Sequence, residues 1–354
     1  MPAVECPGRA AYQHTVECAA AAVPVELFRD STILVTGATG LIGGALVRVF
    51  MYLNRVQGAN IKLLCPVRSI EKARQVLEGV FGRKELNVFE ADIEQPLELF
   101  GEIDYIVHGA AITASRLLVS TPVEAIKSSV AGTLNLLDLA REKQVRGMVY
   151  LSSMEAFGVT DPGLDWVTEE QLGYIDLSSV RSCYGESKRM CEMACRAYQS
   201  EYGVPVSCIR LAQTFGAGIL QSEGRVFKQF AAAALRGENL VLHTRGESTG
   251  NYVHIADALS AILMLLYRGT PGETYTCAGD ECCVKIKELA RLTSDLLSGG
   301  RSAVVIDIPE DAAKLGYAPD VKMRLSNAKL KAAGWRPRFG LADMIRDLGE
   351  DMAQ

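Results

Sequence analysis

The residues best suited to chemistry in this sequence are a tyrosine and a lysine four positions apart, in Tyr184-Gly-Glu-Ser-Lys188. On a helix, positions i and i+4 share one face, so the lysine ammonium can approach the tyrosine hydroxyl. A free tyrosine has a pKa of about 10, and a nearby positive charge lowers that pKa. The pair therefore predicts a tyrosine acid/base, although such pairs also occur by chance on solvated helix faces.

A glycine-rich turn is the second candidate for ligand binding. Residues 31–36 predict a buried strand that runs directly into Gly37-Ala-Thr-Gly40-Leu-Ile-Gly43 and an apolar helix over 45–53. Strand, glycine turn and helix bind dinucleotides, because glycines permit close backbone approach and the helix N-terminus accepts a pyrophosphate. The alternative is a plain strand-to-helix turn. We expect these residues to contact the cofactor: Gly37, Thr39, Gly40, Leu41, Ile42 and Gly43.

The second expected strand, residues 61–67, ends at Arg68. In dinucleotide-binding folds an acidic residue near this position contacts the adenosine ribose and favours NAD, whereas an arginine accepts the 2′-phosphate of NADP. No Asp or Glu occupies the position here, so Arg68 favours NADP modestly and leaves NAD open. The same arginine could also be solvated or stack on adenine.

Further strands and helices alternate along the chain and predict an α/β fold with a Rossmann-like, doubly wound parallel sheet. Strands are expected over 88–93, 105–111, 147–152 and 204–211, and helices over 123–142 and 184–202. The ligand crevice of such a sheet lies beyond the carboxyl ends of its strands. We therefore add to the cofactor site the residues at two of these ends: Asp92, Ile93, Ala110 and Ala111.

The chain is expected to have three parts. Residues 1–30 form an irregular, partly helical N-terminal arm, and residues 31–215 form the dinucleotide-binding domain. Residues 216–354 form mainly a smaller C-terminal α/β substrate lobe, with residues 251–268 returning to the dinucleotide-binding domain.

Composition excludes several classes of function. The chain has 354 residues, 49% of them hydrophobic, and a net charge of −5, which favours neither nucleic acid nor an anionic membrane as partner. Its longest apolar run, residues 258–267, is too short to cross a bilayer, and no secretory signal is expected. The ten cysteines and four histidines show no metal-ligand spacing. We therefore expect no metal and reduced thiols in a cytoplasmic protein.

Together these motifs resemble the extended short-chain dehydrogenase/reductase family, which comprises nucleotide-sugar epimerases, dehydratases and decarboxylases. The resemblance is greatest to UDP-glucuronate decarboxylases, through Val180-Arg-Ser-Cys-Tyr184 and Gly224-Arg-Val-Phe227. The matching segments follow family order over about residues 31 to 340: Thr36-Gly-Ala-Thr-Gly-Leu-Ile-Gly43, Asp92-Ile93, His108-Gly-Ala-Ala111, Leu151-Ser-Ser-Met-Glu-Ala-Phe-Gly158, Tyr184-Gly-Glu-Ser-Lys188, Arg210-Leu-Ala-Gln-Thr-Phe-Gly216 and Ala333-Gly-Trp-Arg-Pro337.

The resemblance implies roles for the catalytic residues. Tyr184 would take the proton of a sugar hydroxyl, while Lys188 lowers the tyrosine pKa and holds the nicotinamide ribose. Ser153 would hydrogen-bond the reacting oxygen, and Glu155 would be the acid/base of the step after oxidation, unless it is a solvated loop carboxylate. Met154 stands where the 4,6-dehydratases have an aspartate, which disfavours dehydration.

Two positions depart from the family pattern. Gly250 stands where decarboxylase-like relatives have an arginine that binds the diphosphate, and Gln213 stands where relatives usually have asparagine. Arg225 matches a family position in the substrate lobe, and Arg245 lies nearby, so either could compensate for the missing arginine. We expect Gln213, Arg225 and Arg245 to bind substrate.

The resemblance thus implies an NAD(P)-dependent enzyme that oxidises a sugar hydroxyl and then decarboxylates or epimerises the keto intermediate. NAD would be bound tightly in such an enzyme, and the chain would form a homodimer through the Tyr184 helix and its neighbour. Arg68 and Gly250 leave open an NADPH-linked carbonyl or alcohol oxidoreductase with a non-nucleotide substrate. A non-catalytic cofactor-sensing protein is a third possibility, against which the set Ser153, Tyr184 and Lys188 argues.

Overall fold

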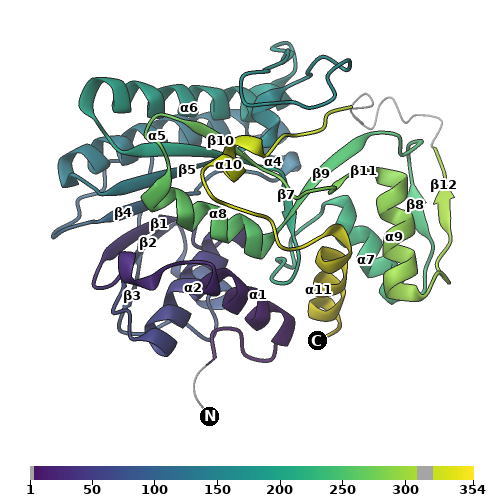
Figure 1. Cartoon of the computed structure of the whole chain (residues 1–354), viewed down its shortest axis with the longest axis horizontal. Helices are drawn as coiled ribbons and strands as arrows, with labels where there is room; N and C mark the ends of the chain where they lie inside the picture. Colours follow the sequence, from purple (N-terminus) through teal and green to yellow (C-terminus); the bar gives the residue numbers. More distant parts are fainter. Residues whose placement is uncertain (1–3, 309–321) are drawn as a thin grey trace.

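The main sheet of the protein is parallel throughout (Figure 1). The computed structural model describes residues 4–308 and 322–354, so residues 1–3 of the expected arm and 309–321 of the expected lobe lie outside the described residues. Within those ranges, seven strands pair in the order β10-β6-β5-β4-β1-β2-β3. They are β1 (Thr32–Thr36), β2 (Lys62–Val67), β3 (Leu86–Glu90), β4 (Tyr105–His108), β5 (Gly147–Ser153), β6 (Val206–Leu211) and β10 (Thr274–Cys277). The expected doubly wound sheet is confirmed.

The order of the strands reverses between β1 and β4, which places a crevice at their carboxyl ends. The two strands are in register with Thr36 opposite His108. Strands β4 and β5 are buried almost throughout, as strands of a sheet covered on both faces must be. This burial explains why their sequences read as continuous apolar runs.

Helices cover both faces of the sheet (Figure 1). Helix α2 (Leu41–Gln57) and helix α8 (Ile255–Arg268) pack with α1 (Ala10–Ala21) on one face, and α5 (Pro122–Lys143) packs with α6 (Cys183–Tyr202) on the other. Two short helices, α3 (Ile70–Val76) and α4 (Ser115–Ser120), complete this part of the chain. The expected arm is largely α1, which contacts both α2 and α8.

A smaller set of elements surrounds its own apolar core beside the main sheet (Figure 1). Strands β7 (Gln213–Phe215), β9 (Thr249–His254) and β11 (Cys283–Lys285) form one sheet, and β8 (Leu240–Leu242) pairs with β12 (Val304–Ile306). Helices α7 (Val226–Leu235), α9 (Ile286–Ser298) and α11 (Leu341–Ala353) pack together around them. The expected division into an arm, a domain and a lobe stays a prediction.

Two segments of the C-terminal part return to the main sheet. Helix α8, within residues 251–268, contacts β5 and β6. Strand β10 also returns and pairs with β6. The sequence Thr274-Tyr-Thr-Cys277 alternates polar and apolar side chains, and its contact with β6 joins residues far apart in the chain. A short strand of this kind has no local signal that assigns it to either sheet.

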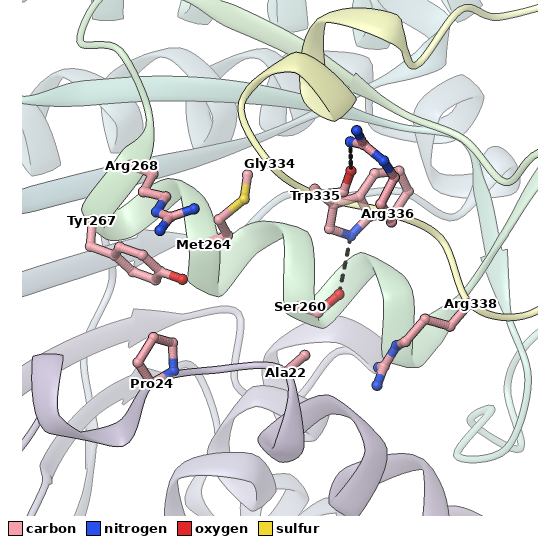
Figure 2. Close-up of a pocket in the computed structure, with 10 residues that line it drawn as sticks. All are labelled: Ala22, Pro24, Ser260, Met264, Tyr267, Arg268, Gly334, Trp335, Arg336 and Arg338. Atoms are coloured by element: carbon pink, nitrogen blue, oxygen red, sulfur yellow. Dashed lines mark hydrogen bonds between the residues drawn. The ribbon is translucent and has the colours of Figure 1, made fainter.

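The segment around Trp335 fastens the C-terminal part to α8 (Figure 2). The Trp335 Nε1–H donates to Ser260 Oγ and to the Asp257 carbonyl, both at 3.1 Å. Asp257 Oδ2 accepts from the backbone amides of Arg338 and Phe339. A cavity of about 250 Å³ lies beside this anchor. It belongs to the α8 face of the sheet, whereas Tyr184 lies on α6, on the opposite face.

Helix α10 (Ala328–Ala332) precedes this anchor.

None of the helices in the described ranges combines the length and the apolar character that a membrane span requires. The ten cysteines form no disulfide, and those on the sheet strands β2, β6 and β10 are buried.

Candidate active site

A cleft of about 400 Å³ lies at the carboxyl ends of β1, β2, β4 and β5. The structure brings every residue that the sequence predicted to bind the cofactor to this cleft. They are Gly37, Thr39, Gly40, Leu41, Ile42, Gly43, Arg68, Asp92, Ile93, Ala110, Ala111, Tyr184 and Lys188. Their convergence is a finding, and their individual contacts with a cofactor stay predictions.

The glycine turn packs tightly against neighbouring backbone, which leaves no room for side chains at Gly37 and Gly43. Gly37 has φ +76°, and a Cβ at this position would lie 2.8 Å from the Gly109 carbonyl carbon. A Cβ at Gly43 would lie 2.2 Å from the Gly37 oxygen. Helix α2 begins directly after Gly40, so its unpaired N–H groups are available to an anion in the cleft. These features fit the pyrophosphate of a dinucleotide.

His108 is buried at the end of β4 and helps to hold the loop that follows it, which lines the cleft. Its Nδ1 pairs with Thr36 Oγ1 at 2.7 Å and its Nε2 with Thr133 Oγ1 at 3.1 Å. Thr36 Oγ1 also accepts from the amides of Gly109 and Ala110. Burial lowers the pKa of His108 to about 3, so the imidazole is neutral at pH 7. His108 therefore has a structural role.

The end of the cleft beside β2 carries two cations. Arg68 follows β2 and is exposed, and Lys72 lies in the first turns of α3. Asp92 is the acidic residue among the lining, and its Oδ1 accepts from the backbone amide of Glu94 at 3.0 Å. Lys72 was not predicted, because a lysine at the start of a short helix is indistinguishable in sequence from a solvated one.

Tyr184 and Lys188 are both buried on the face of α6 that points to the sheet. Lys188 Nζ donates to the Leu151 carbonyl at 2.6 Å and lies 5.6 Å from the centre of the Tyr184 ring. Burial raises the pKa of Tyr184 to about 12, and burial lowers the pKa of Lys188 to about 8. The phenol is therefore protonated at pH 7 until further positive charge approaches it.

Apolar side chains enclose the Tyr184 ring. Ile112, Leu118 and Ala125 pack with it in one small cluster, and the neighbouring Cys183 thiol donates to the Leu118 carbonyl. Exclusion of water from this side strengthens every electrostatic contact of the phenol. Cys183 packs against this cluster.

Ser153 and Glu155 follow each other at the end of β5. The Ser153 hydroxyl accepts from the Glu155 amide at 3.2 Å, and its interaction with the Tyr184 phenol lowers the tyrosine pKa. The Glu155 carboxylate pairs with Arg181, with N–O distances of 2.9 and 3.0 Å. Glu155 thus lies near enough to Tyr184 for its charge to raise the tyrosine pKa, but it is not among the residues that line the cleft.

The three predicted substrate residues are placed differently. Gln213 lies on β7 opposite Tyr252 of β9, at the junction of the two parts of the chain. Arg225 precedes α7 and pairs with Glu223 at 2.5 Å, and its charge lowers the pKa of Tyr184. Arg245 is exposed in the loop between β8 and β9. None of the three is among the residues that line the cleft.

A side chain at position 250 would collide with the Tyr252 ring unless that ring moved. A Cβ there would lie 2.3 Å from the Tyr252 hydroxyl oxygen and 2.6 Å from the adjacent ring carbon. Tyr252 is fully buried, and its hydroxyl has no hydrogen-bond partner among the described residues. The tyrosine therefore fills the space through which a side chain at position 250 would leave the strand.

A buried ion pair behind the site was not predicted. Arg210 of β6 pairs with Glu192 of α6 at 2.7 Å, and Glu192 Oε1 accepts from Ser152 Oγ at 2.5 Å. Arg210 also donates to the Glu169 carbonyl at 2.8 Å. This network ties α6 to β5 and β6, which positions Tyr184 and Lys188. Each residue alone reads as an ordinary polar side chain, so the sequence gives no signal for the network.

Residues of two further segments line the cleft without having been predicted. Ser128 comes from α5, and Leu220 and Ser222 come from the loop before α7. Lys228 donates to the carbonyls of Leu220 and Gln221 and so holds this loop over the cleft. No group of three or more His, Cys, Asp or Glu side chains in the described ranges is arranged to hold a metal ion.

Comparison with known proteins identifies relatives along most of the chain. The model of the NAD dependent epimerase/dehydratase family matches residues 33–278. UDP-glucuronic acid decarboxylase 6 of Arabidopsis thaliana is 29% identical over 327 residues, which cover 90% of this chain and 88% of that protein. UDP-glucuronic acid decarboxylase 1 of Xenopus tropicalis is 28% identical over 306 residues, covering 86% of this chain and 68% of that protein.

Solved structures share the fold. The UDP-glucose 4-epimerase of Thermotoga maritima superposes with a TM-score of 0.74 at 21% identity, covering 91% of this chain and 98% of that one. DesIV, a dTDP-glucose 4,6-dehydratase of Streptomyces venezuelae, gives 0.74 at 24% identity, covering 91% and 97%. The family model spans well over half of the chain. The protein therefore belongs to the NAD-dependent epimerase/dehydratase family, within the extended short-chain dehydrogenase/reductases that its motifs resemble.

Proposed function

We propose that this protein is an NAD(P)-dependent enzyme that oxidises a hydroxyl of a nucleotide sugar and then decarboxylates or epimerises the resulting ketone. The observation that carries the proposal is that Tyr184 and Lys188 line the same cleft as the glycine turn, with Ser153 interacting with the Tyr184 phenol. The similarity to UDP-glucuronic acid decarboxylases over nine-tenths of the chain supports the substrate class.

In the first step, Tyr184 acts as the base. Its phenolate takes the proton of the substrate hydroxyl, and the Ser153 hydroxyl hydrogen-bonds the same substrate oxygen. A bound nicotinamide would accept the hydride from the carbon and return it at the end of the reaction. The buried Lys188 ammonium lowers the free energy of the phenolate, because a positive charge in an enclosed site is poorly screened.

In the second step, the new carbonyl makes a neighbouring bond easier to break. A carboxylate β to the ketone leaves as CO₂, or a proton α to it is removed and returned on the other face. Glu155, beside Tyr184 at the end of β5, is the acid/base that we assign to this step. Met154 has no proton to give to a departing hydroxyl, so we do not expect dehydration.

Support for the choice of cofactor comes from the β2 end of the cleft. Arg68 and Lys72 both line it, and no acidic residue directly follows β2. Two cations and no ribose-binding carboxylate favour a 2′-phosphate, so we infer that the cleft accepts NADP as well as NAD. Competition between the two cofactors in a fluorescence titration, with Arg68→Ala as the comparison, measures the preference.

We also infer a homodimer through α5 and α6, and a cytoplasmic location. Large apolar side chains of both helices are more than a third exposed, which calls for a partner surface. They are Val123, Ile126, Leu134, Met190 and Met193. Ten cysteines without a disulfide favour a reducing compartment.

A product assay tests the proposed function. Purified protein is incubated with NAD or NADP and each of a panel of nucleotide sugars, UDP-glucuronate first, and products are identified by mass spectrometry. We expect loss of CO₂ from a uronate, or an isomer of unchanged mass, with no net change of cofactor absorbance. Tyr184→Phe should form product at least about 100-fold more slowly.

A second candidate function is an NADPH-linked oxidoreductase with a non-nucleotide substrate. Gly250 favours it, because glycine has no side chain with which to bind a phosphate. Steady consumption of NADPH with a small carbonyl compound, and no stabilisation by any nucleotide sugar, would favour this candidate over the first.

A further inference from the structure

The Glu155 carboxylate is paired with an arginine, Arg181. Arg181 holds both of its carboxylate oxygens, Nη1 to Oε2 at 2.9 Å and Nη2 to Oε1 at 3.0 Å. The Arg181 guanidinium carbon lies 5.9 Å from the centre of the Tyr184 ring. A two-pronged contact of this kind fixes the orientation of a carboxylate as well as its charge.

The backbone on both sides of this pair is fixed. Arg189 donates to the carbonyls of Ala156 and Phe157, the two residues after Glu155. Helix α6 approaches this segment closely. A Cβ at Gly185 would lie 3.0 Å from the backbone carbonyl oxygen of Glu155. Since the chain around Glu155 cannot shift easily, contact with Arg181 decides where the carboxylate points.

Charges from several elements face the Tyr184 phenol, whereas α4 and α5 present apolar Leu118 and Ala125. They are Lys188 on α6, Glu155 after β5, Arg181 before α6 and Arg225 before α7, with the neutral His108 of β4 behind Lys188. Glu155 raises the pKa of Tyr184, whereas Arg181 and Arg225 lower it. A carboxylate placed here for one step opposes the ionisation that the other step requires.

We propose that Arg181 is a positioning residue that acts through Glu155. It holds the Glu155 carboxylate in place near Tyr184 and offsets the negative charge of that carboxylate. One carboxylate can then serve the second step without suppressing the first. This inference rests on the proposed function, because the roles of Tyr184 and Glu155 come from there. Arg181 is one third exposed, so without this role the pair would be an ordinary surface ion pair of little consequence.

The first test compares pH–rate profiles of Arg181→Gln, Glu155→Gln, the double variant and Arg181→Lys, with the nucleotide sugar that the wild type converts. Arg181→Gln should lower kcat roughly tenfold at pH 7 and move the acid limb up by about one pH unit, because a carboxylate near the phenol loses its counter-charge. Glu155→Gln should move that limb down. Arg181→Lys should restore the limb and part of kcat.

The double variant separates action through Glu155 from an independent effect. In the Glu155→Gln background, Arg181→Gln should move the acid limb by much less than it does in the wild type, because only the direct effect of the Arg181 charge on Tyr184 is then lost. An equal shift in both backgrounds would show that Arg181 does not act through Glu155. Arg196→Gln is the matched control, because Arg196 is exposed on α6 and pairs with Glu273 at 3.7 Å. We expect its kcat and pH profile to equal those of the wild type.

A second readout does not need turnover. The ultraviolet difference between each protein and its Tyr184→Phe counterpart, titrated with cofactor bound, reports the ionisation of Tyr184 alone. Its midpoint should rise in Arg181→Gln and fall in Glu155→Gln.

The two readouts separate the inference from the proposed function. An unchanged midpoint and pH profile in Arg181→Gln would overturn the role of Arg181, even if Tyr184→Phe abolished turnover. Absence of turnover with every nucleotide sugar would count against the proposed function, and the titration would still decide the inference.

Discussion

At the scale of single residues, the cleft combines a base and a cation whose burial opposes their own ionisation. Burial raises the pKa of Tyr184 to about 12 and lowers that of Lys188 to about 8. Each group is thus less stable in its charged form here than in water. Attraction between the two charges offsets this for both groups, and further positive charge offsets it for the Tyr184 phenolate alone. Perturbed groups that face one another in a cleft are typical of catalytic sites.

The buried lysine should lower the stability of the wild type at neutral pH. Its pKa is about 8 in the folded protein and about 10.4 when unfolded, so the unfolded state binds more protons between these values. The contribution of Lys188 to the free energy of unfolding is therefore least below pH 8 and rises towards pH 10. Lys188→Met should be inactive and more stable at pH 7, by on the order of 1–2 kcal/mol.

Urea denaturation at several pH values measures this difference. It should shrink as the pH rises from about 8 to about 10, and Lys84→Met, at a lysine whose side chain is 89% exposed, should show no such trend. A Lys188→Met protein less stable than the wild type at pH 7 would show that the bond to the Leu151 carbonyl outweighs the burial of charge.

Gly250 offers a residue-scale test of packing. Gly250→Ala places a Cβ 2.3 Å from the Tyr252 hydroxyl and should destabilise the protein by about 1–3 kcal/mol. Tyr252→Phe removes a buried hydroxyl without a partner and should be neutral or stabilising. Thermal denaturation of both variants measures the effect, and unchanged stability of Gly250→Ala would mean that Tyr252 moves freely out of the way.

At the scale of elements, the sequence predicted what depends on local pattern and missed what depends on distant contacts. The sequence predicted the strands β1, β2, β5 and β6 and the glycine turn before α2. A strand that is buried on both faces of a sheet has a continuous run of apolar residues, which the sequence shows directly. Strand β10 was not assigned to the sheet, because its alternating residues gain their place from pairing with β6. Strand β3 runs from Leu86 to Glu90, so it begins two residues and ends three residues earlier than the expected strand over 88–93.

The same distinction applies to the site. Tyr184 and Lys188 are four residues apart, so a helix alone brings them together. The partners Ser152, Glu192 and Arg210 are separated by 40 and 18 residues, and only the packing of α6 on the sheet joins them. The contact of Arg181 with Glu155 spans 26 residues and was missed for the same reason.

The buried pair that positions α6 should matter for stability. Glu192→Gln leaves the Arg210 guanidinium buried without a charged partner, which should lower the free energy of unfolding by about 3–5 kcal/mol. Glu201→Gln, an exposed position near the end of the same helix, should change it by less than about 0.5 kcal/mol. Similar denaturation midpoints for the two variants would show that the network does not hold α6.

At the scale of the whole molecule, two clusters of elements meet where the cleft opens. The main sheet and helix α6 supply the glycine turn and Tyr184, and the loop before α7 supplies Leu220, Ser222 and the nearby charge of Arg225. Helix α8 packs on the sheet and strand β10 pairs with β6, which joins the two parts. Among the described residues, helices α5 and α6 carry several exposed apolar side chains.

This apolar face predicts the oligomeric state. Light scattering should give twice the 38.3 kDa of one chain, and Ile126→Glu with Met193→Glu should give the monomer, because charges in an apolar interface are costly. Val241→Glu, at an equally exposed apolar position on β8, should remain dimeric. A wild type that stays monomeric at assay concentrations would contradict the proposed dimer.

The central claim is that the Tyr184 phenol transfers the proton of a substrate hydroxyl. The most direct measurement is kcat of Tyr184→Phe against the wild type, with the substrate found in the product assay and with cofactor affinity measured in parallel. We predict a fall of kcat by about 10²–10⁴-fold with cofactor affinity almost unchanged, because the phenylalanine ring preserves the packing and removes only the acid/base. A Tyr184→Phe protein with wild-type kcat would contradict the account.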